Sequence, residues 1–384
     1  MLFKDAVGQS ELKNQLIKDV QNNAISHAYI FAGNLGYGGF PLALSFAQYI
    51  NCENPLDTDS CGVCSNCKQM NVLQHPDLHF SFPSVSIKSN NPNICAPFLP
   101  EFYEKVLANP YLTYFDWMVQ VSQSQLVKSK SQEIKQGNIS VDEGARISNA
   151  LSLKSFSGGY KISVIWLAEY MHTATANKLL KILEEPPEKT IFLLITEKLS
   201  ILLPTIISRA RIKRCSPIDK TSMMNWASEH DFNQLEVVES AWGRSEGDFI
   251  HFQSVLTNET DNQTDCENFI QLMRTCYKKE VIPMLDWASS IGSAKKEEQK
   301  NFLLYCLHMV RQCVLINYSG GTISNVSKEE GAFLSKFSKF ISGNNVLSFY
   351  KLFNSAHYAL VRNGNSKILF TNLTFEVMRY IHRA

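Results

Sequence analysis

The stretch that most constrains the fold is a pair of apolar runs joined by one short helical segment. Residues 162–167 and 191–195 are almost entirely apolar, as strands buried on both faces of a sheet require. Between them, apolar residues recur at the spacing of one helix face: Ala176, Leu179, Leu180 and Leu183. Thr173 or Thr175 is the candidate N-cap, and two prolines end the helix. Strand, helix and strand with short joints predict a parallel sheet with helices on both faces.

A glycine-rich loop follows an earlier apolar run, residues 27–32. Its glycines are Gly33, Gly36, Gly38 and Gly39, and a helix is expected from Pro41 to Ile50. Glycines between a strand and a helix are typical of a phosphate-binding loop, which also needs a lysine and a Ser or Thr hydroxyl. Gly39 and Phe40 stand in those two places and supply neither a charge nor a metal ligand. We therefore expect no ATP to bind, while weak binding of an anion at the helix amino end stays open.

Four cysteines have the spacing of a metal site. The pattern C-x8-C-x2-C-x2-C comprises Cys52, Cys61, Cys64 and Cys67. Two short C-x-x-C steps that share a cysteine put three thiols within reach of one ion, and the fourth closes a tetrahedron. In a reducing compartment such thiols do not persist as disulfides, which favours structural zinc, with free or redox-active thiols as the alternative. Four thiolates leave no open position for water, so no metal catalysis is expected.

Composition and charge narrow the class of protein. The chain has 384 residues, 45% of them hydrophobic, which is enough for two or three domains. Lys and Arg number 37 against 36 Asp and Glu, a balance that does not indicate a strongly basic nucleic-acid binder. The first ten residues lack a basic start with an apolar core, and no apolar run reaches membrane-spanning length. We expect a cytoplasmic protein without a signal peptide or membrane partner.

A segment from about residue 80 to residue 138 has a composition of its own. Ser84–Pro97 is rich in Asn, Ser and Pro, as exposed loops are. Aromatic residues follow, too many to leave in water: Phe98, Phe102, Tyr103, Tyr111, Tyr114, Phe115 and Trp117. Stacking on single-stranded DNA is the alternative, but few basic residues are interleaved before Lys128. We therefore expect an insertion that packs on the sheet domain.

Two motifs carry a family resemblance. ANKLLKILEEPPEKT, followed by LLPTIISRARIKRC, resembles the bacterial DNA polymerase III clamp-loader subunits of the AAA+ class, which comprise the gamma/tau motors and the delta-prime subunit. The resemblance is densest over residues 5–80 and 139–215. It implies a P-loop AAA+ α/β module followed by all-α lid and collar domains. The four-cysteine module is also found in this family.

Several single residues take a role from this resemblance. Ser208 and Arg209 match a Ser-Arg-Cys motif whose arginine enters the neighbouring subunit's ATP site, with Ala210 in place of the cysteine. Ala168 and Glu169 stand where a hydrolytic member carries consecutive acids, so the metal-binding acid is missing.

Further residues match the family less specifically. Val7-Gly8-Gln9 resembles the element on the adenine side, and Thr196 matches the sensor position. Arg244 lies near the place of a second sensing arginine, and His75 belongs to an HPD element for which we expect a structural role.

The resemblance favours a delta-prime-like, non-hydrolysing subunit that acts as a stator in DNA replication and donates Arg209 in trans. It implies gamma/tau ATPase subunits, the delta subunit and the sliding clamp as partners, with primer-template DNA reached through the assembled complex. The alternative is a gamma/tau-like ATPase motor, against which Gly39, Phe40 and Ala168 argue together. A separate DNA-binding module is a second rival, weakened by the near-neutral charge.

The predicted domains are an α/β module over residues 1–216, a helical lid over 217–262 and a helical collar over 263–384. The module contains the zinc-binding segment 52–67 and the insertion at about 80–138. A polar stretch, Thr257 to Asp265, is expected to link the lid to the collar. In the collar, one face of a long helix is predicted from Phe302, Cys306, Met309, Val310 and Cys313.

Overall fold

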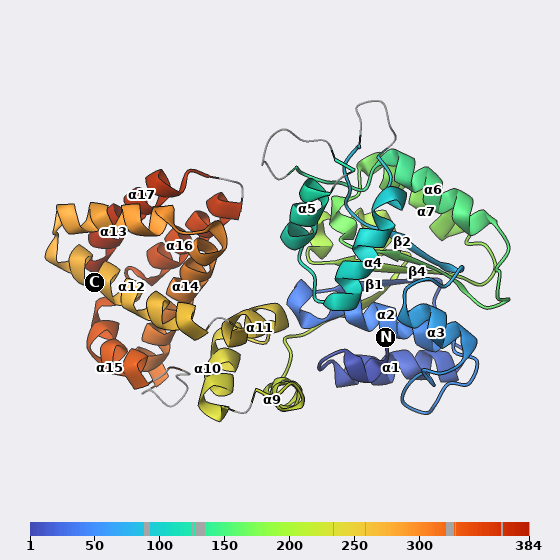
Figure 1. The fold of residues 1–384 in the computed structure, drawn as a ribbon, viewed down its shortest axis with the longest axis horizontal. Coiled ribbons are helices and arrows are strands. Elements are labelled where there is room, and N and C mark those ends of the chain that lie inside the picture. The colour runs from blue at the N-terminus through green and yellow to red at the C-terminus, as the bar shows by residue number, and fades with distance from the viewer. Residues whose placement is uncertain are drawn as a thin grey trace. The chain divides into compact units, whose positions relative to one another are not determined.

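The chain forms two compact units in the computed structural model (Figure 1), which describes residues 1–87, 93–124, 126–127, 135–232, 234–257, 259–319, 326, 328–361 and 364–383. The first unit contains residues 1–226 and 247–250, and the second contains 227–246 and 251–384. The predicted three-domain division with boundaries at 217 and 263 stays a prediction. Lys128 and parts of the polar piece of the insertion lie outside the described residues.

The first unit is built on one sheet of five strands. They are β1 (Ala28–Ala32), β2 (Leu78–Ser81), β3 (Lys161–Ile165), β4 (Thr190–Thr196) and β5 (Arg211–Arg214). Their order across the sheet is β2-β3-β4-β1-β5, and every pair is parallel. This confirms the predicted parallel sheet, with β3 and β4 in the two apolar runs and β1 before the glycine loop.

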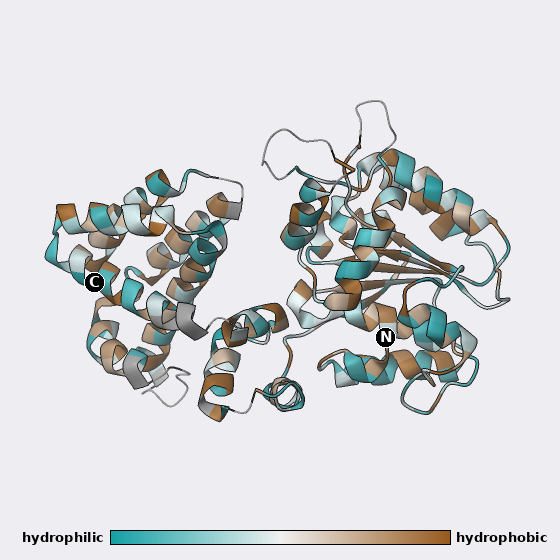
Figure 2. Ribbon diagram, viewed as in Figure 1, coloured by the Kyte–Doolittle hydropathy of each residue, from teal (hydrophilic) through white to brown (hydrophobic). Residues whose placement is uncertain are grey.

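Both faces of the sheet are covered, as the continuous apolar runs require. On one face lies α2 (Gly39–Ile50), and on the other lie α6 (Val141–Ser152) and α7 (Thr173–Glu184), as Figure 1 shows. Successive residues of β4 alternate between the two cores: Leu193 packs in the α2 core, and Phe192 and Leu194 pack in the other. Figure 2 shows the strands largely in the brown of hydrophobic residues.

The predicted cap of α7 is wrong. Its N-cap is His172, whose Nδ1 accepts a hydrogen bond from the Ala174 amide at 3.3 Å. Thr173 and Thr175 are the first and third residues of the helix, and the Thr175 hydroxyl donates to the Ile139 carbonyl at 3.3 Å. An imidazole nitrogen thus does the work of the hydroxyl that the sequence suggested.

The aromatic part of the insertion is packed in the core, as predicted. It comprises α4 (Leu99–Ala108) and α5 (Tyr114–Gln123). Phe102 is fully buried, stacks on Phe82 at 3.9 Å between ring centroids, and lies 5.2 Å from Trp117. These rings extend the apolar core on the α2 face of the sheet.

An ion pair within α6 is hydrogen-bonded to the start of the insertion. Glu143 is fully buried and Arg146 holds its carboxylate through Nε and Nη2. The carboxylate also accepts from the Ser81 hydroxyl at 2.6 Å and the Cys95 amide at 3.0 Å. Burial alone would raise the pKa of Glu143, but Arg146 and these hydrogen bonds outweigh it and the pKa is lowered.

The remaining helices belong partly to the first unit and partly to the second. They are α1 (Ser10–Gln21), α3 (Ser65–Asn71), α8 (Pro204–Ile207), α9 (Lys220–Glu229), α10 (Leu235–Ser245), α11 (Phe249–Thr257), α12 (Glu259–Lys278), α13 (Val281–Ser293), α14 (Lys296–Ser319), α15 (Lys328–Phe337), α16 (Val346–Val361) and α17 (Ser366–Ile381). Within the described residues, the core of the second unit is lined by helices and by Ile341, which follows the short 3-10 helix Ser338–Phe340. The predicted face of α14 is confirmed, since its five residues are all buried. None of the described helices is long and apolar enough to cross a membrane.

The linker predicted at Thr257–Asp265 is wrong for most of its length. Residues from Glu259 onward belong to α12, which continues into the buried residues Phe269, Leu272 and Met273. Once a buried segment has nucleated a helix, each added residue gains a hydrogen bond at little further cost. Polar composition therefore did not stop this helix.

Candidate functional site

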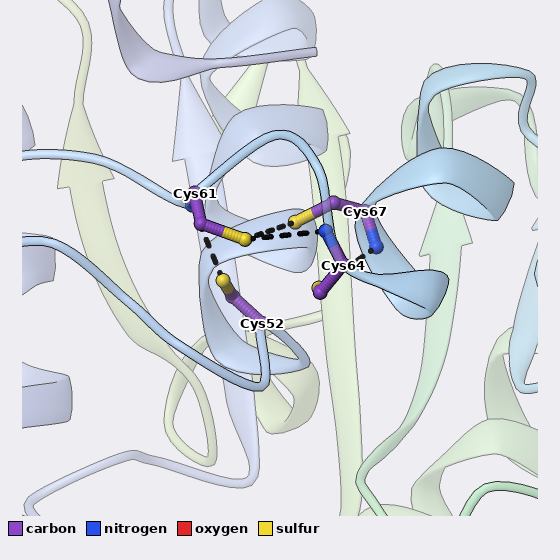
Figure 3. Close-up of side chains that lie close together, drawn as sticks. All are labelled: Cys52, Cys61, Cys64 and Cys67. Carbon is purple, nitrogen blue, oxygen red and sulfur yellow. Dashed lines mark hydrogen bonds between the residues drawn. The ribbon is translucent and has the colours of Figure 1, made fainter.

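Four cysteine sulfurs converge at one point beside α3. Cys52 follows α2, Cys61 lies in the next loop, Cys64 is the N-cap of α3, and Cys67 lies in its first turn. All four Sγ atoms lie within 4.8 Å of one another, and those of Cys61 and Cys67 are 3.9 Å apart. Figure 3 shows the sulfurs facing a common centre. Zinc–sulfur bonds of about 2.3 Å in a tetrahedron place sulfurs about 3.8 Å apart, so the donor set fits a four-thiolate ion.

Backbone amides point at these sulfurs. The Cys61 amide donates to Sγ of Cys52 at 3.3 Å, and the Cys64 and Cys67 amides donate to Sγ of Cys61 and Cys64, each at 3.4 Å. Amides of Val63 and Cys64 lower the pKa of Cys61 to about 6, whereas burial raises the pKa of Cys52 and Cys67. Amide donors of this kind stabilise thiolates, which are the form that binds a metal.

The HPD element supports the cysteine cluster from outside it. His75 is buried, its Nδ1 accepts from the Asp77 amide at 3.2 Å, and its Nε2 lies 3.3 Å from Oδ1 of Asn66 in α3. Both ring nitrogens are therefore engaged with protein groups. Asp77 in turn accepts from the amides of Phe156 and Ser157 at 2.8 and 2.9 Å.

The glycine loop lies where the sequence places it, between β1 and α2. Gly38 has a φ of +81°, which favours glycine, and Gly39 is the first residue of α2. A Cβ on Gly39 would lie 3.3 Å from Sγ of Cys215, so this position is already crowded. Phe40 is 1% exposed, with its ring 6.2 Å from that of Phe102 and 5.8 Å from that of Trp166. Phe40 is thus part of the aromatic core.

Acidic groups lie near this loop at the carboxyl ends of the strands. Oε1 of Glu169 accepts from the Glu197 amide at 3.0 Å. Burial, followed by the charge of Glu169, raises the pKa of Glu197. Thr196 is fully buried, and its hydroxyl accepts from the Lys198 amide at 3.2 Å. Carboxylates in these places oppose, rather than attract, a bound phosphate.

Arg209 lies just beyond the short helix α8. Its side chain is 34% exposed, and Nη2 pairs with Oε1 of Glu184 at 2.8 Å. Nη1 donates to the Thr205 carbonyl at 2.9 Å and lies 3.4 Å from Oγ of Ser208. The guanidinium is held at a defined place on the surface by one carboxylate and one carbonyl.

Arg244 belongs to the second unit and is buried there. It pairs with Glu330, and its guanidinium lies 5.0 Å from the centre of the Tyr305 ring. The charge of Arg244 is thereby satisfied inside a helical core.

Sequence reasoning gave no role at these places to three residues that the structure brings there, although Tyr111 was predicted to be packed. Glu184 is the first acid of the LEEPP motif and now pairs with Arg209. Tyr111 and Asp248 lie against Gly38 and Gly36 of the loop. Each is far along the chain from its neighbour, so local spacing carried no signal of the contact.

Comparisons with known proteins identify the family of the chain. The family model described as "DNA polymerase III, delta subunit" matches residues 8–219. DNA polymerase III subunit delta' of Escherichia coli is 22% identical over 312 residues, covering 81% of this chain and 77% of that protein. Subunit delta' of Bacillus subtilis is 27% identical over 224 residues, covering 58% and 52%.

Subunit tau/gamma of Haemophilus influenzae is 25% identical over 221 residues, covering 58% of this chain. The matched region spans about half of the Bacillus subtilis protein and a quarter of the Haemophilus influenzae protein. The family model covers more than half of the 384 residues. The chain therefore belongs to the DNA polymerase III delta subunit family.

Proposed function

We propose that this chain is a non-hydrolysing, delta-prime-like subunit of the bacterial sliding-clamp loader. It works in the cytoplasm beside gamma/tau ATPase subunits and the delta subunit, and it reaches the sliding clamp and primer-template DNA through the assembled complex. Its family membership and its similarity to both delta' and tau/gamma subunits support this assignment.

The observation that carries the non-hydrolysing role is the burial of Phe40. A hydroxyl at this position would hold Mg²⁺ and a lysine before it would reach the phosphates. Here Phe40 packs against Phe102 and Trp166, and Gly39 is crowded by Cys215. Ala168, 1% exposed, offers no carboxylate for a metal. Gly39, Phe40 and Ala168 therefore supply neither the lysine and hydroxyl of a phosphate-binding loop nor the metal-binding acid.

Arg209 is proposed to act on the neighbouring subunit's ATP. A guanidinium is planar, permanently charged and able to make two hydrogen bonds to phosphate oxygens. In this chain it is partly exposed, and Glu184 holds it by one nitrogen. We propose that Glu184 and Ser208 are positioning residues, which keep the guanidinium aimed outward until the partner's phosphates replace the carboxylate.

The cysteine cluster is proposed to hold one structural zinc ion. Cys52, Cys61, Cys64 and Cys67 would supply four thiolates, and the ion would fix the loop between α2 and α3. With four protein ligands the ion has no catalytic position, so its contribution is to folding.

Reconstitution of the whole loader tests the role of Arg209. Arg209→Ala should leave assembly unchanged and slow hydrolysis at the adjoining ATP site by about 10³-fold or more, as loss of a trans-acting arginine does elsewhere. Arg209→Lys should recover only part of the rate. Glu184→Gln should lower the rate of hydrolysis at the adjoining ATP site by about 1.5- to 5-fold, because exposed ion pairs contribute about 0.2–1 kcal/mol. Single-turnover ATPase and clamp-loading rates are the measurements.

Arg211→Ala is the matched control, since Arg211 is also exposed and ion-paired, with Asp19 at 2.8 Å. It should load clamps at the normal rate. If Arg209→Ala assembles and loads clamps like the unmodified chain, Arg209 is a surface charge and the proposal fails. ATP turnover by the purified chain alone would favour a motor subunit instead.

A further inference from the structure

The space above the glycine loop is filled by a side chain of the insertion. Tyr111, between α4 and α5, is 5% exposed. A Cβ on Gly38 would lie 3.3 Å from Cε1 and 3.4 Å from the hydroxyl oxygen of Tyr111. The phenol ring therefore lies directly on the backbone that precedes α2. In a phosphate-binding loop this backbone faces the ligand.

Tyr111 makes polar and apolar contacts of the kind that a bound ring would make. Its hydroxyl accepts a buried hydrogen bond from the Val7 amide at 2.8 Å. Its ring centre lies 4.4 Å from that of Phe249, which is 1% exposed and lies 4.8 Å from the ring of Trp226. One residue thus joins the amino-terminal segment, the glycine loop and the start of α11.

A carboxylate occupies the next part of the loop. A Cβ on Gly36 would lie 1.9 Å from Oδ1 of Asp248, so this side chain rests on the Gly36 backbone. The segment that carries it is also tied down by its main chain, since the Ile218 amide donates to the Gly247 carbonyl at 2.9 Å. A negative charge here excludes a phosphate by repulsion as well as by volume.

We propose that Tyr111 and Asp248 are the permanent internal occupants of this loop, Tyr111 in the place of a ligand's planar ring and Asp248 in the place of an anion. The insertion thereby supplies, through Tyr111, a side chain in the place where a ligand would bind. Segment 247–250 is held against the α/β domain by contacts within the chain, without a bound ligand. This inference concerns the isolated chain and stands apart from the role of Arg209.

The test uses the full-length chain and replaces Tyr111. Tyr111→Ala should lower the melting temperature by roughly 10 °C, because a large buried ring is lost. Amide exchange should accelerate by at least about 100-fold at Val7 and across residues 247–250, but not in β1. Tyr111→Phe keeps the ring but loses the acceptor for the Val7 amide. It should lower the melting temperature by only about 2–4 °C.

Tyr114→Ala is the matched control. Tyr114 belongs to the same insertion but stacks on Tyr170 at 4.1 Å. Its loss should leave exchange at Val7 and residues 247–250 unchanged. If Tyr111→Ala does not fold, Tyr111→Leu keeps apolar volume without the ring or hydroxyl and should give the same exchange pattern.

Chemical complementation with 4-methylphenol provides a second readout. This phenol should enter the cavity left by Tyr111→Ala and raise its melting temperature by about 3 °C at saturating concentration. 4-Methylphenol should not change the melting temperature of the unmodified chain or of Tyr111→Phe. Unaltered exchange at Val7 and 247–250 in both the Ala and Leu variants would overturn the proposal. Equal stabilisation of the unmodified chain by 4-methylphenol would do so too.

Discussion

The cysteine cluster and the glycine loop lie at opposite ends of the same helix, α2, and they differ in what faces their centre. At the cysteine cluster, four sulfurs converge and backbone amides point at them. At the glycine loop, side chains from elsewhere lie on the backbone, Tyr111 on Gly38 and Asp248 on Gly36. One place presents donor atoms to a common centre, and at the other we propose that the chain's own side chains occupy the loop.

This difference teaches how a ligand site is recognised when both sites carry a motif. Glycines keep the loop's shape, because a φ of +81° at Gly38 is needed whether or not a ligand binds. Shape alone therefore does not indicate a working site. Convergent, unblocked donor atoms do, because their mutual repulsion is relieved only by a cation or by protonation.

Removal of the metal should give the largest loss of stability. It tests whether the cysteine cluster is a ligand site, as the comparison with the glycine loop requires. Protein prepared without chelator should contain one zinc per chain, and Cys67→Ser should abolish it. Structural zinc contributes about 10–16 kcal/mol in isolated zinc-finger peptides, so segment 52–67 should lose its structure. Elemental analysis and thermal unfolding with and without chelator are the measurements.

Cys313→Ser is the control for this experiment, since Cys313 is fully buried in the second unit. That variant should keep its zinc and lose only the stability that a buried hydroxyl costs, about 1–3 kcal/mol. Absence of zinc from the unmodified protein would contradict the assignment of the cluster.

Restoring the loop's missing residues should give the second-largest effect. Gly39→Lys with Phe40→Thr should not restore ATP turnover, because Tyr111 and Asp248 still cover the loop. The pair should instead destabilise the chain by about 3 kcal/mol or more, since Phe40 leaves the aromatic core. Phosphate release and denaturant unfolding are the measurements.

Phe156→Thr is the matched control, because Phe156 is 84% exposed. It should change stability by less than about 0.5 kcal/mol. Stabilisation of the double variant by ATP would mean that the loop opens, and the contrast with the cysteine cluster would disappear.

Asp77→Asn should give the smallest loss of stability. It distinguishes the cysteines that bind the metal from a residue that only supports the fold around them. Burial alone would raise the pKa of Asp77, but hydrogen bonds from the Ser157 and Phe156 amides outweigh it, and the pKa falls below its ordinary value of 3.8. The carboxylate's stabilisation is therefore present above about pH 4 and is lost as pH falls through the lowered value. The variant should lose about 1 kcal/mol at pH 7.

The measurement is denaturant unfolding of both proteins at several pH values, with zinc content as the control readout. The difference between the two proteins should shrink below about pH 4, and both should hold one zinc at pH 7. A constant difference down to pH 2 would show that the ionised carboxylate is not the source of the stabilisation. Loss of zinc from the variant at pH 7 would show that Asp77 is needed for the metal site as well as for the fold.

Local pattern was enough to predict β1, β3 and β4 of the five-stranded sheet and the members of the cysteine cluster, but not the edge strands β2 and β5. β1, β3 and β4 carry apolar runs because both of their faces are covered, whereas the edge strand β5 is Arg-Ile-Lys-Arg. C-x2-C spacing brings sulfurs together over a single turn. The caps and the linker were predicted less well. The α7 cap is the His172 imidazole, which accepts from the Ala174 amide in place of a threonine hydroxyl. α12 begins at Glu259 inside a polar stretch because its later, buried residues stabilise the helix.

The sequence by itself determined which chemistry the loop lacks, since Gly39 and Phe40 have neither charge nor hydroxyl. Only the tertiary structure decided what fills the loop and what holds Arg209. Tyr111 meets Val7 across 104 residues of chain, and Glu184 meets Arg209 across 25. Short-range spacing reports contacts within a helix turn or along a strand. Contacts of this longer range arise only when the apolar faces of separate elements pack into one core.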